Sequence, residues 1–249
     1  MRGPSGPFEL SIAFLAAGAL LTTFLWDENK AEKSTADDGK ETKPTIRDAI
    51  KVVKADPKIM LVGAVQSLFE AAMYIFVLQW PPAISKAVAG AFEGSMTPYG
   101  TVFSCFMASC LLGSTIFGQL VKNNVSTESF TSVMLSVATI AMGTAAWVTS
   151  SSSAITMPLA ALVASFFAFE GCVGMYFPSI GTLRSKYVPD SHRSVIMNLF
   201  GIPLNALVVG VFLSIKKLGV TGALSVSTGA LAVATFAMMK LKSLKGNDV

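Results

Sequence analysis

Long apolar stretches alternate with shorter polar ones along the whole chain. Seven stretches are long enough to form membrane-spanning helices, at about residues 9–25, 59–80, 98–121, 129–149, 154–178, 195–215 and 219–239. Each is close to the ~20 residues that a helix needs to cross ~30 Å of hydrocarbon. The alternation typical of a membrane β-strand is absent, and a helix satisfies its own backbone in lipid. The pattern predicts an all-α membrane protein with seven transmembrane helices.

Two of these stretches contain a glutamate that directly follows a phenylalanine, in Phe69-Glu70 and Phe169-Glu170. A carboxylate at membrane depth is costly and usually marks a functional pathway. Because the dipeptide recurs, we expect two repeated three-helix units whose first helices cross the membrane in opposite directions. An inverted 3+3 repeat of this kind forms each six-helix half of the major facilitator fold. The last six helices are predicted to form one such half.

The pattern also divides the chain into three segments. Residues 1–27 hold a single transmembrane helix, residues 28–58 a charged cytoplasmic linker, and residues 59–249 a six-helix bundle with a cytoplasmic tail. From Thr45 onward, apolar residues recur at helical spacing, which fits either an amphipathic helix at the membrane surface or a solvated connector. With the linker inside, most Lys and Arg residues lie on the cytoplasmic side, as the positive-inside rule requires. The basic residues on the other side are Arg2, Lys86, Lys216 and Lys217.

The composition excludes several functional classes. The chain is 52% hydrophobic and 14% charged, whereas a soluble domain has about 25% charged residues. The three cysteines fall inside predicted helices and the single histidine in a short loop, so neither a disulfide framework nor a metal site is expected. No nucleophile–base pair is visible. We therefore expect a multi-pass protein of the cell membrane or an organelle membrane, with lipid as a partner and no enzyme activity, cofactor, metal or nucleic acid.

Polar residues on one face of a membrane helix are the candidates for a substrate pathway. Gln66, Glu70 and Tyr74 are spaced by four residues and share one face, which fits a cavity lining or a ladder of hydrogen bonds between helices. Asn198 and Asn205 share a face of the sixth stretch, where they would either bind a polar substrate or pin two helices together.

A second carboxylate, Glu170, lies beside Gly171 and Gly174, which would give neighbouring groups close access. The alternative is a buried glutamate paired with a basic residue, but no Lys or Arg is predicted at its depth. Arg184 and Arg193 are assigned to a cytoplasmic gate or loop. The predicted pathway residues are Gln66, Glu70, Tyr74, Glu170, Asn198 and Asn205.

Small residues and prolines indicate where helices pack closely or bend. Ser109/Gly113 and Ala206/Gly210 have the four-residue spacing that lets two membrane helices approach. Pro178 is expected to end or kink the fifth stretch, and Pro203 to kink the sixth.

Several of these stretches resemble the molybdate-anion transporter family, a branch of the major facilitator superfamily. The matching segments are Trp26-Asp-Glu-Asn29, Gln66-Ser-Leu-Phe-Glu70, Met73-Tyr74-Ile-Phe76, Phe169-Glu170-Gly-Cys-Val-Gly174, Pro178-Ser179, Arg184-Ser-Lys-Tyr187-Val-Pro189, Arg193-Ser-Val-Ile-Met197-Asn198 and Ile202-Pro203-Leu204-Asn205. In order and spacing they extend over nearly the whole chain from residue 9.

The resemblance implies a membrane transporter that moves a small anion, molybdate, by alternating access. Family members have about twelve helices, and this chain is similar to the last seven, so a missing N-terminal half is an expected partner. Either an incomplete gene model or a half-transporter that pairs with another chain fits this. The chain departs from the family at Gly201, where members have arginine.

The departure at Gly201 bears on the substrate, because arginine binds two oxygens of an oxyanion at once. With two glutamates and no basic group nearby, the chain alone is not expected to bind or transport molybdate, and Gly201→Arg should strengthen anion binding. The alternatives are a transporter of another small solute, a non-transporting membrane scaffold and a seven-helix receptor. The receptor lacks support because neither Asp-Arg-Tyr after the third stretch nor Asn-Pro-x-x-Tyr at the end of the seventh is present.

Overall fold

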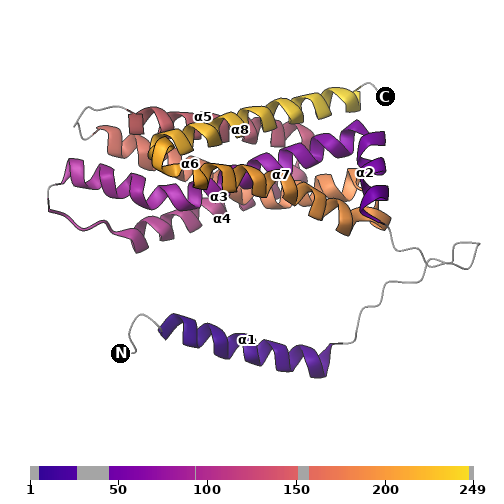
Figure 1. Cartoon of the computed structure of the whole chain (residues 1–249), viewed down its shortest axis with the longest axis horizontal. Coiled ribbons are helices and arrows are strands. Elements are labelled where there is room, and N and C mark those ends of the chain that lie inside the picture. Colours follow the sequence, from indigo (N-terminus) through magenta and orange to yellow (C-terminus); the bar gives the residue numbers. More distant parts are fainter. Residues whose placement is uncertain (1–5, 27–44, 93, 151–156, 247–249) are drawn as a thin grey trace, which may run out of the picture. The chain divides into compact units, whose positions relative to one another are not determined.

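The computed structural model describes residues 6–26, 45–92, 94–150 and 157–246, and these residues are almost entirely helical. The helices are α1 (Gly6–Leu25), α2 (Ile46–Ala55), α3 (Pro57–Ala91), α4 (Tyr99–Lys122), α5 (Thr127–Ser150), α6 (Met157–Tyr187), α7 (Arg193–Leu213) and α8 (Ile215–Gly246), with a 3₁₀ turn at Asp190–His192 (Figure 1). Seven of the eight α-helices are long and apolar enough to cross a membrane. The predicted all-α membrane protein with seven spanning helices is confirmed.

The chain forms two units, Met1–Lys43 and Pro44–Val249. The first unit contains α1, which is apolar over most of its surface and has Glu9 as its charged residue; the hydroxyls of Thr22 and Thr23 donate to backbone carbonyls of the same helix. A helix that is hydrophobic all round has to be buried in lipid or against other helices. The second unit contains α2 to α8 and all the sites described below.

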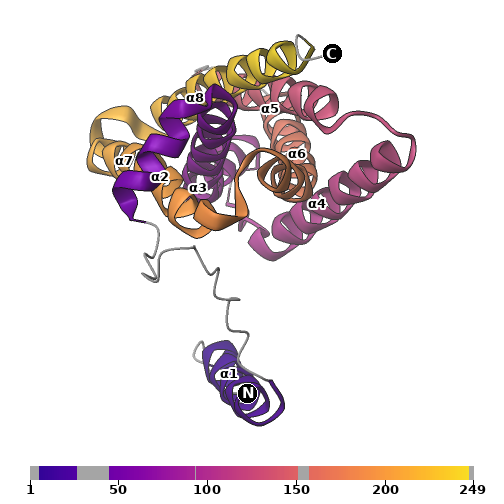
Figure 2. The same cartoon turned by 90° about the vertical axis from the view of Figure 1, so that its right-hand side faces the viewer.

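The most extensive helix contacts of the second unit keep the same pattern when α3, α4 and α5 exchange places with α6, α7 and α8. Helix α3 packs on α7 and α8, while α6 packs on α4 and α5. The two pairs that map onto themselves, α3 with α6 and α5 with α8, are also packed (Figures 1 and 2). This exchange symmetry is what an inverted 3+3 repeat requires.

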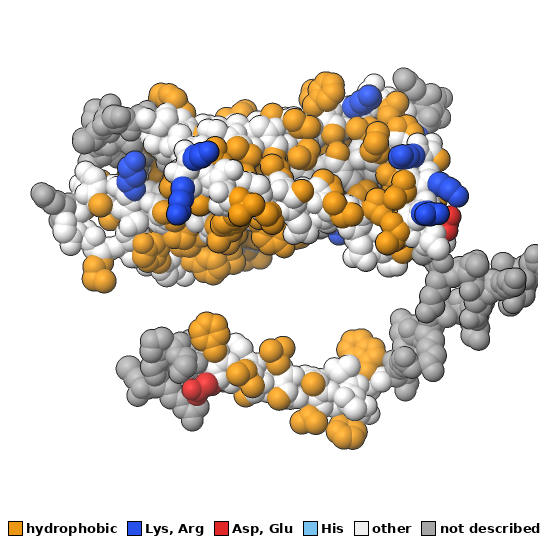
Figure 3. Space-filling view, viewed as in Figure 1, with side chains coloured by type: hydrophobic (Ala, Val, Ile, Leu, Met, Phe, Trp, Pro, Cys, Tyr) orange, Lys and Arg blue, Asp and Glu red, His pale blue; other side chains and the backbone are white. Residues whose placement is uncertain are grey.

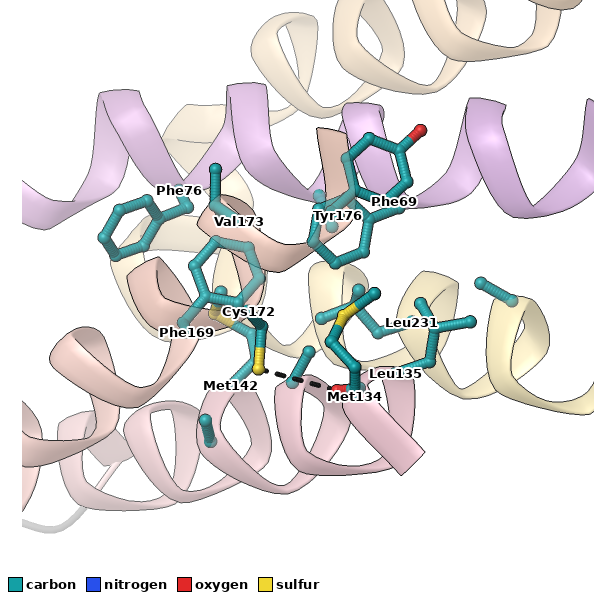
Figure 4. Close-up of a cluster of buried hydrophobic side chains, with 14 of the residues drawn as sticks. Phe69, Phe76, Met134, Leu135, Met142, Phe169, Cys172, Val173, Tyr176 and Leu231 are labelled. Carbon is teal, nitrogen blue, oxygen red and sulfur yellow. Dashed lines mark hydrogen bonds between the residues drawn. The ribbon is translucent and has the colours of Figure 1, made fainter. Parts of the chain in front are cut away.

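The aromatic side chains of the repeated Phe-Glu dipeptides meet in the centre of the bundle. The rings of Phe69 and Phe169 stack with centroids 5.9 Å apart, and Phe69 also stacks on Tyr176 at 4.0 Å. Phe76 extends the cluster by contacting Phe169 at 4.9 Å. All four side chains are fully buried, and Figure 4 shows them between α3 and α6. The repeat is therefore also a packing contact between its two copies.

Two helices are longer than the hydrophobic pattern predicts, because both continue through proline. Helix α3 runs through Pro81 and Pro82 to Ala91, and α6 runs through Pro178 to Tyr187. Membrane helices tolerate proline where side-chain hydroxyls satisfy freed backbone groups. The Ser179 hydroxyl, next to Pro178, donates to the Met175 carbonyl at 2.6 Å. Pro178 does not end α6, which places the residues up to Tyr187 in the helix.

Helix α2 lies within the segment predicted to be a charged linker. A capping box starts it: Asp48 donates its backbone N–H to the Thr45 hydroxyl, and Thr45 donates its own N–H to the Asp48 carboxylate at 3.3 Å. Its Ala49 is fully buried in a small core with Ile196 and Phe200 of α7. Of the two readings of the segment after Thr45, the structure has the helix, packed on α7. The first half of the linker lies outside the described residues.

Helices α4 and α6 approach so closely that glycine is required at the contact. A Cβ atom added to Gly113 would lie 1.8 Å from the Gly171 carbonyl oxygen, and one added to Gly174 would lie 1.8 Å from the Cys110 carbonyl oxygen. The predicted close packing at Gly113 is confirmed. Gly210 has open space around it, so the second predicted pair does not mark such a contact.

Candidate substrate-pathway site

Four side chains from α3 and α6 form a hydrogen-bonded cluster, which we call the Glu70 cluster: Gln66, Glu70, Tyr176 and Arg184. The Arg184 guanidinium donates from Nη2 to the Glu70 Oε1 at 3.0 Å and from Nε to the Gln66 Oε1 at 2.9 Å. The Tyr176 hydroxyl donates to the same Glu70 oxygen at 3.0 Å. A carboxylate, a guanidinium, an amide and a phenol therefore join two helices at one point.

The local structure places each member of the cluster. Gln66 and Glu70 are one turn apart on α3, and Tyr176 and Arg184 are two turns apart on α6, so each pair shares a face. Side chains on a helix point back toward its N-terminus. Arg184 lies near the C-terminal end of α6, and its long side chain therefore extends back into the bundle, where Glu70 meets it.

This arrangement corrects an expectation from the sequence. The prediction that no arginine or lysine of these helices offsets the buried carboxylates is wrong for Glu70, which forms an ion pair with Arg184. The error came from ending the helix at Pro178, which left Arg184 in a loop. In the structure Arg184 belongs to α6, and its position eight residues after Tyr176 is the signal that could have revealed the contact.

The cluster is neutral overall and partly accessible. The side chains of Arg184 and Glu70 are 28% and 19% exposed, while Gln66 and Tyr176 are buried. An ion pair that is partly exposed is worth little by itself, because water competes with both partners. The hydrogen bonds that Tyr176 donates to Glu70 and that Gln66 accepts from Arg184 fix the geometry of the cluster. The guanidinium is therefore held in one orientation while part of it stays within reach of a solute.

The other predicted pathway residues lie apart from these contacts. Tyr74 is one turn beyond Glu70 on α3 and is half exposed. Asn198 and Asn205 are exposed on α7, and the Asn205 amide donates to the Gly201 carbonyl of its own helix at 2.8 Å. Glu170 is buried on α6, and no other described side chain forms a hydrogen bond or ion pair with it. The structure thus brings Gln66 and Glu70 together, and the other predicted pathway residues take no part in the Glu70 cluster.

Arg193, the second arginine assigned to a gate or loop, has a local role. It is the first residue of α7 and pairs with Asp190 at 2.5 Å, while its Nη2 donates to the Val188 carbonyl at 3.1 Å. Both partners lie in the turn between α6 and α7. Arg193 therefore closes this turn.

Sequence reasoning missed a second charged cluster, centred on Glu128 at the start of α5. Its carboxylate accepts hydrogen bonds from Lys186 and Tyr187 at the end of α6 and from Lys245 at the end of α8. The Glu128 side chain is 2% exposed, and both lysine side chains are about half exposed. The cluster ties three helix ends together. Its partners are 58 and 117 residues away in sequence, so spacing alone could not have shown it.

Comparison with known proteins adds the family. Residues 2–176, which reach from α1 to Tyr176 in α6, match a family model of the major facilitator type described as sugar transporters with 12 transmembrane segments. The chain belongs to this family. It is also 27% identical over 205 residues to the molybdate-anion transporter of Xenopus tropicalis and 28% identical over 236 residues to that of Takifugu rubripes. The one from Danio rerio is 27% identical over 237 residues.

The match is extensive in this chain and partial in its relatives. It covers 82% of the chain but 42% of the Xenopus tropicalis protein and 45% of the Takifugu rubripes protein. The chain thus spans less than half the length of the curated relatives it matches. No solved structure matches the chain. Family membership and the seven apolar helices make it a multi-pass membrane protein.

Proposed function

We propose that this chain forms part of a transporter for small oxyanions, molybdate being the substrate that its relatives indicate, and that Arg184 contributes to anion binding. The single observation that carries the proposal is the guanidinium of Arg184, held in one orientation by Gln66 and Glu70 and still partly exposed. A planar guanidinium that is fixed in this way matches the paired oxygens of an oxyanion.

The Glu70 carboxylate would compete with the substrate anion for the Arg184 guanidinium. An oxyanion with two negative charges that approaches Arg184 also approaches the Glu70 carboxylate, 3.0 Å from Nη2. Two like charges about 4 Å apart repel by about 4 kcal/mol per charge pair near a protein surface. The anion would bind only when the Glu70 carboxylate is turned away from Arg184. Exchange of Glu70 for the anion would then couple substrate binding to the α3–α6 contact.

The missing arginine at position 201 limits the affinity that one half can provide. A Cβ atom at Gly201 would have Asn205 Nδ2 as its nearest neighbour at 3.8 Å, so an arginine there has room to extend. We expect further basic groups from an N-terminal half, with substrate bound between the halves and alternating access by rocking of one half against the other. The basic ends of α4, α6 and α8 would face the cytoplasm.

Binding of molybdate to the purified 249-residue chain tests the proposal. With isothermal titration calorimetry in detergent, Glu70→Gln should bind molybdate more tightly than the unsubstituted chain, because it frees Arg184. The double variant, Glu70→Gln with Arg184→Gln, should bind molybdate about 10- to 100-fold more weakly than Glu70→Gln alone. The reason is that a charge-assisted hydrogen bond contributes about 1.5–3 kcal/mol.

Glu170→Gln is the matched control, because it removes one buried carboxylate from α6 without touching Arg184. A gain in affinity as large as that of Glu70→Gln would mean that only the overall charge of the bundle matters. If Glu70→Gln binds molybdate no more tightly than the unsubstituted chain, or if the loss of Arg184 changes nothing, the assignment of Arg184 is wrong.

A second candidate is a transporter for a neutral polar solute, which the description of the matching family favours. The Glu70 cluster is neutral as it stands, and Tyr74, Asn198 and Asn205 present exposed hydrogen-bonding groups. In this case a sugar such as glucose should bind the chain, and Asn198→Ala with Asn205→Ala should abolish binding. Glu70→Gln should then leave affinity for molybdate undetectable.

A further inference from the structure

A large apolar groove lies on the side of the bundle, away from the Glu70 cluster. It has a volume of about 770 Å³ and is formed by α4, α5 and α6, with one residue from α8. Its walls are branched and aromatic side chains such as Leu112, Ile116, Val133 and Val137, and Gly171 and Cys172 form part of its floor. None of the predicted substrate-pathway residues lines it.

The groove exists because α4 and α5 both pack on α6 and diverge from each other (Figure 2). The glycine contacts at Gly113 and Gly174 bring α4 directly onto α6. The small side chains of Ser109, Ala168 and Gly171 then leave the space between the two walls unfilled. The groove is open and its lining is almost entirely apolar, which suits the acyl chain of a lipid.

The groove has one apolar end and one polar end. Leu120 at the end of α4, Ser129 in the first turn of α5 and Lys242 near the end of α8 line the polar end. On α4 the lining runs from Leu120 to Ser109, which at 1.5 Å per residue is about 16 Å. This is half of the ~30 Å hydrocarbon core, the thickness of a single leaflet.

Charge identifies the head group that suits the polar end. Lys242 is exposed, and no acidic side chain among the described residues pairs with it. Glu128, which precedes Ser129 on α5, forms ion pairs with Lys186 and Lys245 and is shielded by them. Lys122 and Lys240 are also exposed near the ends of α4 and α8, and Figure 3 shows basic side chains near both ends of the bundle. Basic sites at the ends of membrane helices bind anionic lipid head groups.

We propose that the groove binds one phospholipid with an anionic head group, with an acyl chain between α4 and α5 and its phosphate at Lys242. The apolar walls exclude a small hydrated anion, so this site is separate from any substrate site. An anionic lipid bound there would fill the space between α4 and α5 and stabilise their contacts with α6.

Native mass spectrometry of the purified chain tests this with phosphatidylglycerol and phosphatidylcholine of identical acyl chains. Phosphatidylglycerol should bind about fivefold more tightly, the effect of one lysine near a charged lipid. Lys242→Gln should abolish this preference, so that the two lipids bind with equal affinity. Lys240→Gln, which changes a neighbouring lysine outside the groove, should keep the preference.

A second pair of variants tests the acyl-chain position. Ala168→Phe should fill the groove and weaken both lipids, while Ala164→Phe, one turn away on α6 and outside the groove, should not. Equal binding of the two lipids to the unsubstituted chain, or loss of the preference in Lys240→Gln, would overturn the head-group assignment. The lipid site would be refuted if Ala168→Phe bound both lipids unchanged. It would also be refuted if the lipid-free chain formed a dimer that Ala168→Phe disrupts, because a second copy would then occupy the groove.

Discussion

Replacing Gly174 by alanine tests the α4–α6 contact most directly. The added Cβ would lie 1.8 Å from the carbonyl oxygen of Cys110 and 2.6 Å from its carbonyl carbon. Both are backbone atoms of a helix, so no side-chain rotation can relieve the clash. The helices would have to separate by more than 1 Å at this point. The movement would also separate Gly113 from the Gly171 carbonyl, which is the second contact of the same interface.

The two contributions to the free energy of unfolding have opposite signs. Alanine in place of glycine stabilises a helix by about 1 kcal/mol. Overpacking of a well-filled interface costs about 1–3 kcal/mol and occasionally more, and here the rigid backbone excludes the cheapest relaxation. Loss of packing along α4 adds to the cost, because small residues allow membrane helices to associate closely. We expect a net destabilisation of about 2 kcal/mol or more.

Thermal unfolding of the detergent-solubilised protein, monitored by size-exclusion chromatography, measures this loss of stability. Gly181→Ala is the matched control, since Gly181 is exposed on the same helix and has nothing near its Cβ position. The control should be as stable as the unsubstituted protein or more stable, and Gly174→Ala should melt several degrees lower. Equal melting temperatures for the two variants would refute the close approach of α4 and α6.

Three further predictions concern the Glu128 cluster, the membrane topology and the capping box of α2. Glu128→Gln should lower the free energy of unfolding, measured with a denaturant, by about 1–2 kcal/mol. Loss of a fully buried ion pair would lower it more, but here the two remaining lysines can reach water. Replacing Lys186 and Lys245 together by methionine should lower it further than Glu128→Gln does, because it leaves a buried carboxylate without its cationic partners. Cysteines at Ser34 and Ser243 should resist impermeant thiol reagents in intact cells if both segments are cytoplasmic, and labelling before permeabilisation would reverse the topology; Ser34 lies outside the described residues. The hydrogen bond from Thr45 lowers the pKa of Asp48, so the capping box stabilises α2 fully above the ordinary carboxyl pKa of about 4 and loses this effect as the pH falls through the lower folded value; a spin label at Lys54 should become mobile in acid, and at neutral pH in Thr45→Ala.

The hydrophobic pattern was sufficient to predict the number and approximate position of the spanning helices. Each predicted stretch overlaps one observed helix, because twenty apolar residues in a row have few alternatives to a membrane helix. The helix ends were predicted less well. Apolar character ends near Trp80 and Pro178, whereas the helices continue to Ala91 and Tyr187 through proline. Hydropathy indicates which part of a helix lies in the hydrocarbon core, and the helix can continue beyond that part.

The candidate site was predicted in part for the same reason. The costly carboxylate identified Glu70, and helical spacing placed Gln66 beside it. The partners from α6 could not be predicted from α3, since a contact across 114 residues depends on how two helices pack. Arg184 was placed in a loop because the predicted helix ended too early. Tyr74 shares the helix face of Glu70 but is too far along the helix to join the cluster.

The repeat itself explains why only one of the two glutamates acquired partners. Shifting the members of the Glu70 cluster by 100 residues gives the equivalent positions around Glu170: Phe166 for Gln66, Phe76 for Tyr176 and Ile84 for Arg184. All three are apolar and fully buried. One copy of the site is therefore polar and the other hydrophobic, although both kept the Phe-Glu dipeptide.

A designed ion pair tests this equivalence. Ile84→Arg places a guanidinium at the position that corresponds to Arg184, and burial of a lone charge there should be strongly destabilising. If the two copies are related by the repeat, Glu170 will meet the new arginine as Glu70 meets Arg184. Ile84→Arg should then destabilise the protein less when Glu170 is present than in a Glu170→Gln background, with an interaction free energy of about 0.5–3 kcal/mol in a double-mutant cycle of unfolding. Additive effects of the two substitutions would show that Glu170 and position 84 do not face each other, and that the structural equivalence of the repeats ends at their phenylalanines.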